Sequence, residues 1–484
     1  MDSNSKGPKG KAVTDVKAPA MGRAPAKGRS VTSQVSLFER VPDWARLSWP
    51  DIAAILSGVV SSLSKLMGGG IVAFYAGCQL GGVTVAITFA LSFVLTYFVG
   101  KICFREGLPN NVVSRYYIFG KNGSAVGSLI WIFVLVGVLA VGTVQLGNAI
   151  LFAFGWEGDF ARWALFIGIS CVWVLMALFG TKVIARMNAV FVIALFCVMG
   201  YVIYLIAADG QLVDAATHGI MIPGVEPLEG FAYSVNYAIM TSGLLALFAA
   251  DFTRFAKKER DIVPISLTGT IFAIVTYIFG ALIVYYGFEQ SFAYFSAQGM
   301  DATLAANAAV TNPGVSLVLA SGGIGLAIIC LSQMKTSNSI GGANAVSNLF
   351  DSLFGRKLAW PVAVIIANAI GLAFILGNIL DQVNAFMSYG SILTSSWCIL
   401  LITDYYIVRG KMGIGAQGID LGAREHTVNW RGVGTLVAVS AVASVLYATN
   451  ILQIPFLLVA PASMVIYILV SWLLRDKVRS GKVA

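Results

Sequence analysis

Residues 61–70 read Ser61-Ser62-Leu63-Ser64-Lys65-Leu66-Met67-Gly68-Gly69-Gly70, and they lie near the middle of the first long apolar run of the chain. Consecutive glycines weaken a helix, and polar side chains in a lipid-facing span have no partners there. A shorter polar stretch, Thr241-Ser242-Gly243, lies within the sixth apolar run. Interrupted helices at corresponding places in two halves are typical of inverted-repeat transporters, whose binding site lies between the breaks. The alternative is that the glycines only allow helices to pack closely.

The composition is that of a membrane protein. Of the 484 residues, 58% are hydrophobic and 11% are charged, and the mean hydropathy is +0.82. Soluble domains are more polar than this. The net charge of +9 is dispersed at the ends of apolar runs, whereas nucleic-acid-binding proteins cluster it on one face. The six cysteines form no Cys-x-x-Cys pair and the chain has two histidines, so we expect no disulfide, metal site or cofactor.

The apolar runs predict a chain of membrane-spanning helices, since a bilayer core needs roughly 20 apolar residues per span. We expect twelve spans at about 51–78, 80–104, 124–154, 163–180, 187–208, 231–255, 262–287, 313–340, 358–376, 384–408, 433–449 and 455–474. These divide into a first five-helix repeat over 51–208, a second, inverted repeat over 231–408 and two additional helices over 433–474. Residues 1–50, rich in Lys, Pro, Gly and Ala, predict a disordered basic tail, and residues 475–484 form the other terminus.

The distribution of basic residues predicts the orientation in the membrane. Of the 32 Lys and Arg residues, Lys65 and Lys335 fall within spans and Arg162 in a loop of one face, and the rest fall at the other face. The long loops 209–230 and 288–312 contain acidic residues but no Lys or Arg. We therefore expect both termini in the cytoplasm, in a multi-pass protein of the bacterial inner membrane.

Three short segments carry a family resemblance. They are Ala250-Asp251-Phe252-Thr253-Arg254-Phe255, Thr403-Asp404-Tyr405-Tyr406-Ile407-Val408-Arg409, and Arg115-Tyr116-Tyr117-Ile118-Phe119-Gly120 followed by Gly123-Ser124. In order and spacing they resemble segments of the nucleobase:cation symporter-1 family, which includes purine-cytosine permeases, cytosine permease and hydantoin transporters. The resemblance covers roughly residues 50–474. It implies an all-α, leucine-transporter-type fold of five-plus-five inverted repeats with two extra helices, which moves nucleobase-like rings with Na⁺ or H⁺ by alternating access.

Within these motifs we expect structural roles at a cytoplasmic gate. Asp251 and Arg254 lie three residues apart on one helix, a spacing at which opposite charges can pair. Asp404 is expected to cap or tether its helix end.

The substrate site differs from that of the relatives, in which an aromatic residue in each of the third and sixth spans sandwiches the flat ring. The matching positions lie near Val138 and Ser242. Candidate replacements are Trp131, Phe133, Tyr233, Tyr237 and Phe248, although aromatic residues in spans more often pack. We predict substrate contacts at Ser64, Lys65, Gly68, Gly69, Thr241, Ser242, Gly243, Gln333 and Asn338. For polar side chains such as Gln145, hydrogen bonding between helices is an equal alternative.

The eighth span departs from Na⁺-dependent relatives, which have two hydroxyl residues near its end. Lys335 falls on the first of these positions and Thr336 on the second, and the carbonyl partners would be near Gly58 and Ser61. An ammonium there would supply the charge of the ion. We therefore expect coupling to H⁺, or independence from Na⁺. The alternative is that Lys335 snorkels to the membrane surface.

Lys65 is a second ionisable residue within a span, and such residues are functional candidates by default. No Asp or Glu lies inside the neighbouring apolar runs to neutralise it. Either one of the two lysines is neutral, or the solute brings a negative charge.

The sequence therefore predicts a secondary transporter of a nucleobase or related small heterocycle, and no enzyme. The alternative is a carrier of amino acids, other organic cations or organic anions on the same fold. A channel would show a selectivity-filter segment, and a membrane enzyme would show clustered His, Asp or Glu at one depth. The sequence contains neither pattern.

The topology can be tested with reporter fusions. We expect fusions at Gly210 and Ala297 to report from outside the cell, because these loops lack basic residues. Fusions at Lys257, Gly418 and the C-terminus are expected to report from the cytosol. Paired reporters, one active on each side of the membrane, make the measurement; an external C-terminus would exclude the twelve-span topology.

Overall fold

The computed structural model describes residues 39–60, 62–179, 181–334, 338–356, 358–422 and 427–479. Over this part of the chain every regular element is a helix, and an isolated bridge between Leu47 and Ala256 is the only β-type pairing. The long apolar runs of the sequence thus form helices, which satisfy their own backbone polar groups.

The helices of the first half are α1 (Trp49–Val60), α2 (Leu63–Glu106), α3 (Asn110–Ser114), α4 (Ser124–Trp131), α5 (Gly137–Phe154), α6 (Asp159–Phe179), α7 (Thr181–Ala208) and α8 (Leu212–Thr217). Those of the second half are α9 (Pro227–Thr253), α10 (Ile262–Ala297), α11 (Ala302–Thr311), α12 (Pro313–Met334), α13 (Asn338–Phe354), α14 (Trp360–Leu376), α15 (Val383–Ile402), α16 (Trp430–Ala448), α17 (Phe456–Leu473) and α18 (Arg475–Arg479). Short 3₁₀ or π segments are η2 (Asp43–Ala45), η3 (Arg115–Phe119), η4 (Ile132–Val136), η5 (Glu259–Asp261) and η6 (Thr403–Lys411).

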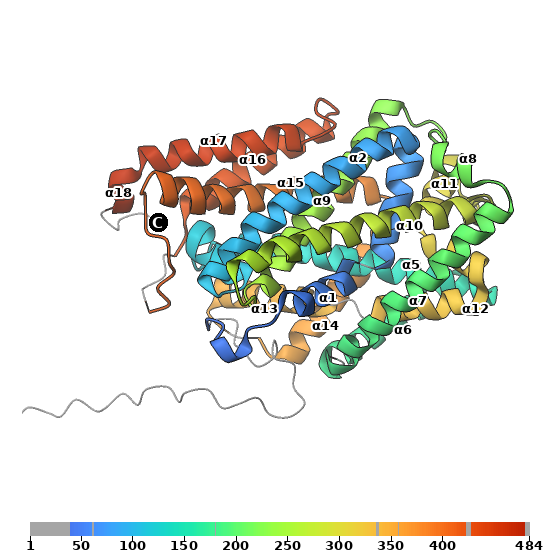
Figure 1. Cartoon of the computed structure of the whole chain (residues 1–484), viewed down its shortest axis with the longest axis horizontal. Helices are drawn as coiled ribbons and strands as arrows, with labels where there is room; N and C mark the ends of the chain where they lie inside the picture. Colours follow the sequence, from blue (N-terminus) through green and yellow to red (C-terminus); the bar gives the residue numbers. More distant parts are fainter. Residues whose placement is uncertain are drawn as a thin grey trace, which may run out of the picture.

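The helices form one bundle around a central group. Figure 1 shows α2, α9 and α10 running through its middle, and both α9 and α10 pack against α2. On one flank α16 and α17 pack against α15, and on the other α7 packs against α12. The central helices therefore carry most of the contacts that position the site.

The twelve predicted spans can be traced through these helices. Nine helices of the described chain are long and apolar enough to cross a membrane, and α7 and α14 contain shorter apolar stretches. Two predicted spans lie in α2, whose backbone turns at Gly77. With α2 divided there, the helices are consistent with twelve spans.

The N-terminal tail is shorter than expected. Residues 39–50 were predicted to be disordered, yet Val41 and Ala45 are buried, and the Leu47 N–H donates to the Phe255 carbonyl at 2.7 Å. The few apolar residues of this segment pack on the loop after α9, a contact that composition alone did not predict.

The first span is broken, but upstream of the glycines. α1 ends at Val60 and α2 begins at Leu63, and Ser62 between them is extended (φ −100°, ψ 161°). Gly68–Gly70 lie inside α2. The predicted interruption at Thr241–Gly243 is wrong, because α9 is helical throughout. Of the two predicted breaks, only the one in the first span is therefore present.

The glycines instead serve close packing. A Cβ at Gly69 would lie 1.8 Å from the carbonyl oxygen of Tyr277 in α10, and one at Gly280 would lie 1.9 Å from a backbone carbonyl of α2. A Cβ at Gly68 would lie 2.3 Å from an aromatic ring of α9. In α9, a Cβ at Gly243 would lie 2.7 Å from the Thr394 hydroxyl of α15. Small residues let membrane helices approach this closely, so the simpler alternative for these glycines holds.

The turn inside α2 is closed by a loop from farther along the chain. Gly77 has a left-handed backbone (φ 72°, ψ 160°), which frees backbone groups on either side. The Cys78 N–H donates to the His218 carbonyl at 2.9 Å, and the Met221 N–H donates to the Phe74 carbonyl at 3.0 Å. The loop before α9 thus satisfies the backbone at this end of the bundle.

The described residues of the eighth predicted span, 313–340, fall in two helices. α12 ends at Met334, and a new helix, α13, begins at Asn338. α13 buries Ala343 and Val346 and packs against α4 and α14. Its mixed polar and small residues concealed it in an analysis based on apolar runs.

The contact between α2 and α10 gives a stability prediction. Gly69→Val is expected to lower the free energy of unfolding by about 1–3 kcal/mol or more, because the added carbons meet a backbone carbonyl. The matched control is Gly82→Ala, which lies on the same helix with nothing within 4 Å of the added Cβ. The midpoint of thermal unfolding in detergent measures both; an equal midpoint for Gly69→Val and the control would contradict this packing.

Candidate functional site

A cavity lies beside the break between α1 and α2. Its wall comes from the first turn of α2, from η4 and α5, from one face of α9, and from α13 and α15. The lining residues are Ser62, Ser64, Lys65, Leu135, Val138, Tyr237, Met240, Thr241, Leu244, Leu245, Phe248, Asn338 and Met387. The cavity follows α9 from Tyr237 to Phe248, about three helical turns. It therefore extends from the middle of the bundle towards the end of α9 that carries Asp251.

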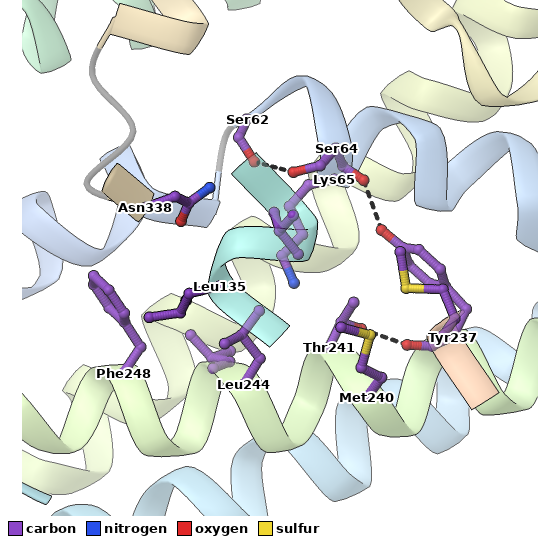
Figure 2. Close-up of a pocket in the computed structure, with 13 residues that line it drawn as sticks. Ser62, Ser64, Lys65, Leu135, Tyr237, Met240, Thr241, Leu244, Phe248 and Asn338 are labelled. Carbon is purple, nitrogen blue, oxygen red and sulfur yellow. Dashed lines mark hydrogen bonds between the residues drawn. The ribbon is translucent and has the colours of Figure 1, made fainter. Parts of the chain in front are cut away.

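The polar part of the cavity is built on the break. The hydroxyl oxygens of Ser62 and Ser64 lie 3.0 Å apart, and the Tyr237 hydroxyl donates to the Ser64 carbonyl at 2.7 Å. Figure 2 shows the first contact within the start of α2 and the second joining the first turn of α2 to α9. The bond from Tyr237 fixes the start of α2 against α9, so the side chains of that turn have a defined direction.

Lys65 extends from the same turn into the cavity (Figure 2). The residue is only 9% exposed, and no described residue hydrogen-bonds to or forms an ion pair with its ammonium group. The described lining contains no Asp or Glu. The cavity therefore has one buried basic group and no acid to balance it.

A second polar position lies on α9. The Thr241 hydroxyl donates to the Tyr237 carbonyl at 2.9 Å and accepts from the Tyr277 hydroxyl at 2.5 Å. Leu244, Leu245 and other apolar side chains complete the wall. An apolar chamber with a few fixed polar groups is the usual form of a small-molecule site.

The aromatic candidates separate into two groups. Tyr237 and Phe248 line the cavity. Trp131 packs on Trp397 with ring centroids 5.6 Å apart. Phe133 and Tyr233 also make contacts outside the cavity. The ring centroids of Phe133 and Phe386 lie 5.1 Å apart, and the Tyr233 hydroxyl donates to the Glu229 carboxylate at 2.7 Å.

Four of the predicted substrate residues line the cavity, namely Ser64, Lys65, Thr241 and Asn338. Four others lie in helix contacts instead. Gly68, Gly69 and Gly243 pack against neighbouring helices, and the Ser242 hydroxyl lies 2.8 Å from that of Ser92. The amide of Gln145 donates to the Thr311 carbonyl at 2.7 Å, which is the alternative role.

Most of the residues predicted to bind the coupling cation are not among those that the structure describes. Ser61, Lys335 and Thr336 lie outside the described residues. Gly58 is helical in α1 and Gln333 is helical in α12, at the two helix ends that face these gaps.

The predicted gate residues have well-defined partners. Asp251 accepts from the Asn110 N–H at 2.8 Å and so caps α3, while the Arg254 guanidinium lies 4.6 Å from the Phe255 ring centroid. The expected ion pair between Asp251 and Arg254 is therefore replaced by these contacts.

Asp404 joins η6 to α17. Its buried carboxylate accepts from Arg409 Nε at 2.6 Å and from the Tyr467 hydroxyl at 2.7 Å. This geometry is that of a tether between helices.

Some lining residues had no place among the predictions. Leu244 and Leu245 lie three and four residues after Thr241, and Met240 lies three residues after Tyr237, so helical spacing finds them. Leu135 and Met387 carry no local signal, because only the packing of distant helices brings them to the cavity.

Comparison with known proteins gives the same fold. The inward-facing structure of Mhp1 superposes with a TM-score of 0.65 at 18% identity, covering 89% of this chain and 92% of Mhp1. Mhp1 in a closed conformation with bromovinylhydantoin bound, described as a nucleobase-cation-symport-1 family transporter, gives 0.62 at 16% identity over 90% and 96% of the two chains. A manganese transporter of Eremococcus coleocola gives 0.53 at 12% identity over 89% and 95%. These likenesses confirm the all-helical leucine-transporter-type fold.

The sequence comparison adds the family. No curated protein matches the chain. A family model described as permease for cytosine/purines, uracil, thiamine, allantoin matches residues 41–474, which is most of the sequence. The chain therefore belongs to this family of nucleobase–cation symporters, and it is a multi-pass membrane transporter rather than an enzyme.

Proposed function

We propose that the chain imports a nucleobase or related small heterocycle, such as a cytosine-, purine-, hydantoin- or allantoin-like compound, by alternating access. The cavity beside the helix break carries the proposal. It offers an apolar wall with Phe248 and Tyr237, polar groups at Ser64, Thr241 and Asn338, and a place between α2, α5 and α9. Its mixed lining suits a flat ring with hydrogen-bonding edges. Mhp1, with the same fold, holds a hydantoin.

A second cavity supports a transport path. It is lined in part by Asn148, Arg162, Gln298, Asn312 and Asp381, where α10 ends. α10 begins at the end of the bundle that carries Asp251, so this cavity is at the opposite end. The two cavities suit alternating access, in which one site is reached from each side in turn.

The moving parts follow from the repeat. We propose that residues 51–208 and 231–408 are the two inverted halves and that 433–474 adds two helices outside them. In the cell both termini face the cytoplasm, so the cavity beside the break extends towards the cytoplasm.

For coupling we propose H⁺, or independence from Na⁺. The support is chemical. Lys335 stands at the position where Na⁺-dependent relatives have the first of two hydroxyl residues, and it follows the end of α12 closely in sequence. An ammonium at a monovalent-cation site supplies the same charge and repels the ion.

The substrate class can be tested by competition. Uptake of a labelled ring by intact cells that express the protein is expected to fall when an excess unlabelled purine, pyrimidine or cyclic ureide is added, because these rings fit the same cavity. Cells without the protein are the control. Competition by open-chain amino acids alone would favour the alternative carrier class.

The coupling proposal needs proteoliposomes with Na⁺ and pH gradients imposed separately. The initial uptake rate of the wild type is expected to be unchanged when choline replaces Na⁺ and to rise with an inward proton gradient. Lys335→Ala is expected to lose accumulation against a gradient while keeping some exchange, and Lys335→Ser to regain partial Na⁺ dependence. Strict Na⁺ dependence of the wild type would overturn the role given to Lys335.

A further inference from the structure

The charge of the cavity is unusual for a site that takes neutral rings. Lys65 is nine-tenths buried, and its ammonium has no hydrogen-bond or ion-pair partner among the described residues. Removing a charge from water without a partner is strongly unfavourable. The ammonium form of Lys65 is therefore retained only when something that binds in the cavity offsets its charge.

The backbone beside Lys65 adds to the positive potential. α2 begins at Leu63, and no side chain caps this end. The N–H groups of Lys65 and Leu66 donate to the Ser62 carbonyl, which leaves the first two N–H groups of the helix without a helical acceptor. The N-terminus of a helix attracts anions, and acidic residues are the ones favoured there. A lysine in this turn adds to the positive field instead of cancelling it.

The surrounding helices supply no counter-charge. Between its ends α9 has no Asp or Glu: Glu229 is bonded to Tyr233 at one end, and Asp251 caps α3 at the other. α5 and α15 contain no acidic residue at all, and Asp351 of α13 pairs with Arg115 at 3.5 Å. The acidic residues of the described helices that line the cavity are thus absent from its described lining.

The geometry points to an anion site formed by the Lys65 ammonium and the first turn of α2, and to an anionic heterocycle as the transported substrate. The ring carries a carboxylate, or is acidic enough to lose a ring proton near neutral pH. This inference rests on the proposed function, since it names the substrate class of the same cavity. The negative group lies at Lys65, and the ring lies along the apolar face of α9 towards Phe248.

Matched pairs of compounds test the charge directly. Uracil and uracil-6-carboxylate share one ring, and hypoxanthine and urate share another, and in each pair only the second is an anion at neutral pH. Each is offered as a competitor of ring uptake and as a ligand that raises the thermal unfolding midpoint. In the wild type we expect the anion of at least one pair to bind about ten- to a hundredfold more tightly, as for a hydrogen bond to a charged group.

Variants then assign the preference to Lys65. Lys65→Gln is expected to weaken the anion about ten- to a hundredfold while changing the neutral partner less than about threefold. Lys65→Arg keeps the charge and is expected to retain the preference. The matched control is Lys101→Gln on the same helix, where Lys101 pairs with Glu259 at 2.8 Å outside the cavity, and the preference should be unchanged.

The possible failures are distinct. A wild type that takes the neutral member of each pair and rejects the anion overturns this inference and leaves the proposed function intact. This measurement needs no variant, so a misfolded Lys65→Gln does not block it. If no ring of either charge competes and open-chain amino acids do, the proposed function itself fails. An anion preference that survives in folded Lys65→Gln places the anion site elsewhere.

Discussion

The bond from the Tyr237 hydroxyl to the Ser64 carbonyl, 2.7 Å long, is the interaction on which the site depends. In hydrocarbon every backbone polar group needs a partner, so a helix can be broken inside a membrane only where protein or ligand replaces the lost bonds. Here the bond from α9 holds the first turn of α2 in place although no side chain caps it. The continuous α9, which has no break at Thr241–Gly243, presents Tyr237 to this turn.

Close packing secures the same turn from its other side. The backbone of α2 touches α10 where Gly69 meets the Tyr277 carbonyl and where Gly280 faces α2. Tyr277 also reaches the Thr241 hydroxyl, so α2, α9 and α10 meet within a few residues of the cavity. Thr241 in the cavity wall is therefore also part of the contact between the central helices, so movement of this part of the wall requires these helices to shift.

Apolar runs were enough to predict the membrane spans and an all-helical fold, because these depend on composition along single helices. The leucine-transporter-type arrangement came from the family resemblance, and the polar stretch at 61–65 drew attention to the region where the structure has a cavity. Local patterns failed where the outcome depends on a neighbour. Gly68 and Gly69 were interpreted as a helix break, yet neighbouring helices pack closely against them. Ser242 was predicted to contact substrate, yet its hydroxyl lies beside that of Ser92 rather than in the cavity. Leu135 and Met387 reach the cavity only through tertiary packing. Helical spacing from Thr241 would have recovered the α9 face, since that signal is local.

Alternating access requires that the substrate interact differently with the open and the occluded states, because a ligand with equal affinity for both shifts nothing. An unpaired buried ammonium supplies such a difference. When the cavity is open to water, the charge of Lys65 is hydrated; when the helices close, it loses that hydration and needs a partner. With an anionic ring bound, a neutral pair is enclosed and the penalty largely disappears. An empty carrier would then close reluctantly and a loaded one readily, so the single lysine in the first turn of α2 would both select the charge of the substrate and couple its binding to movement.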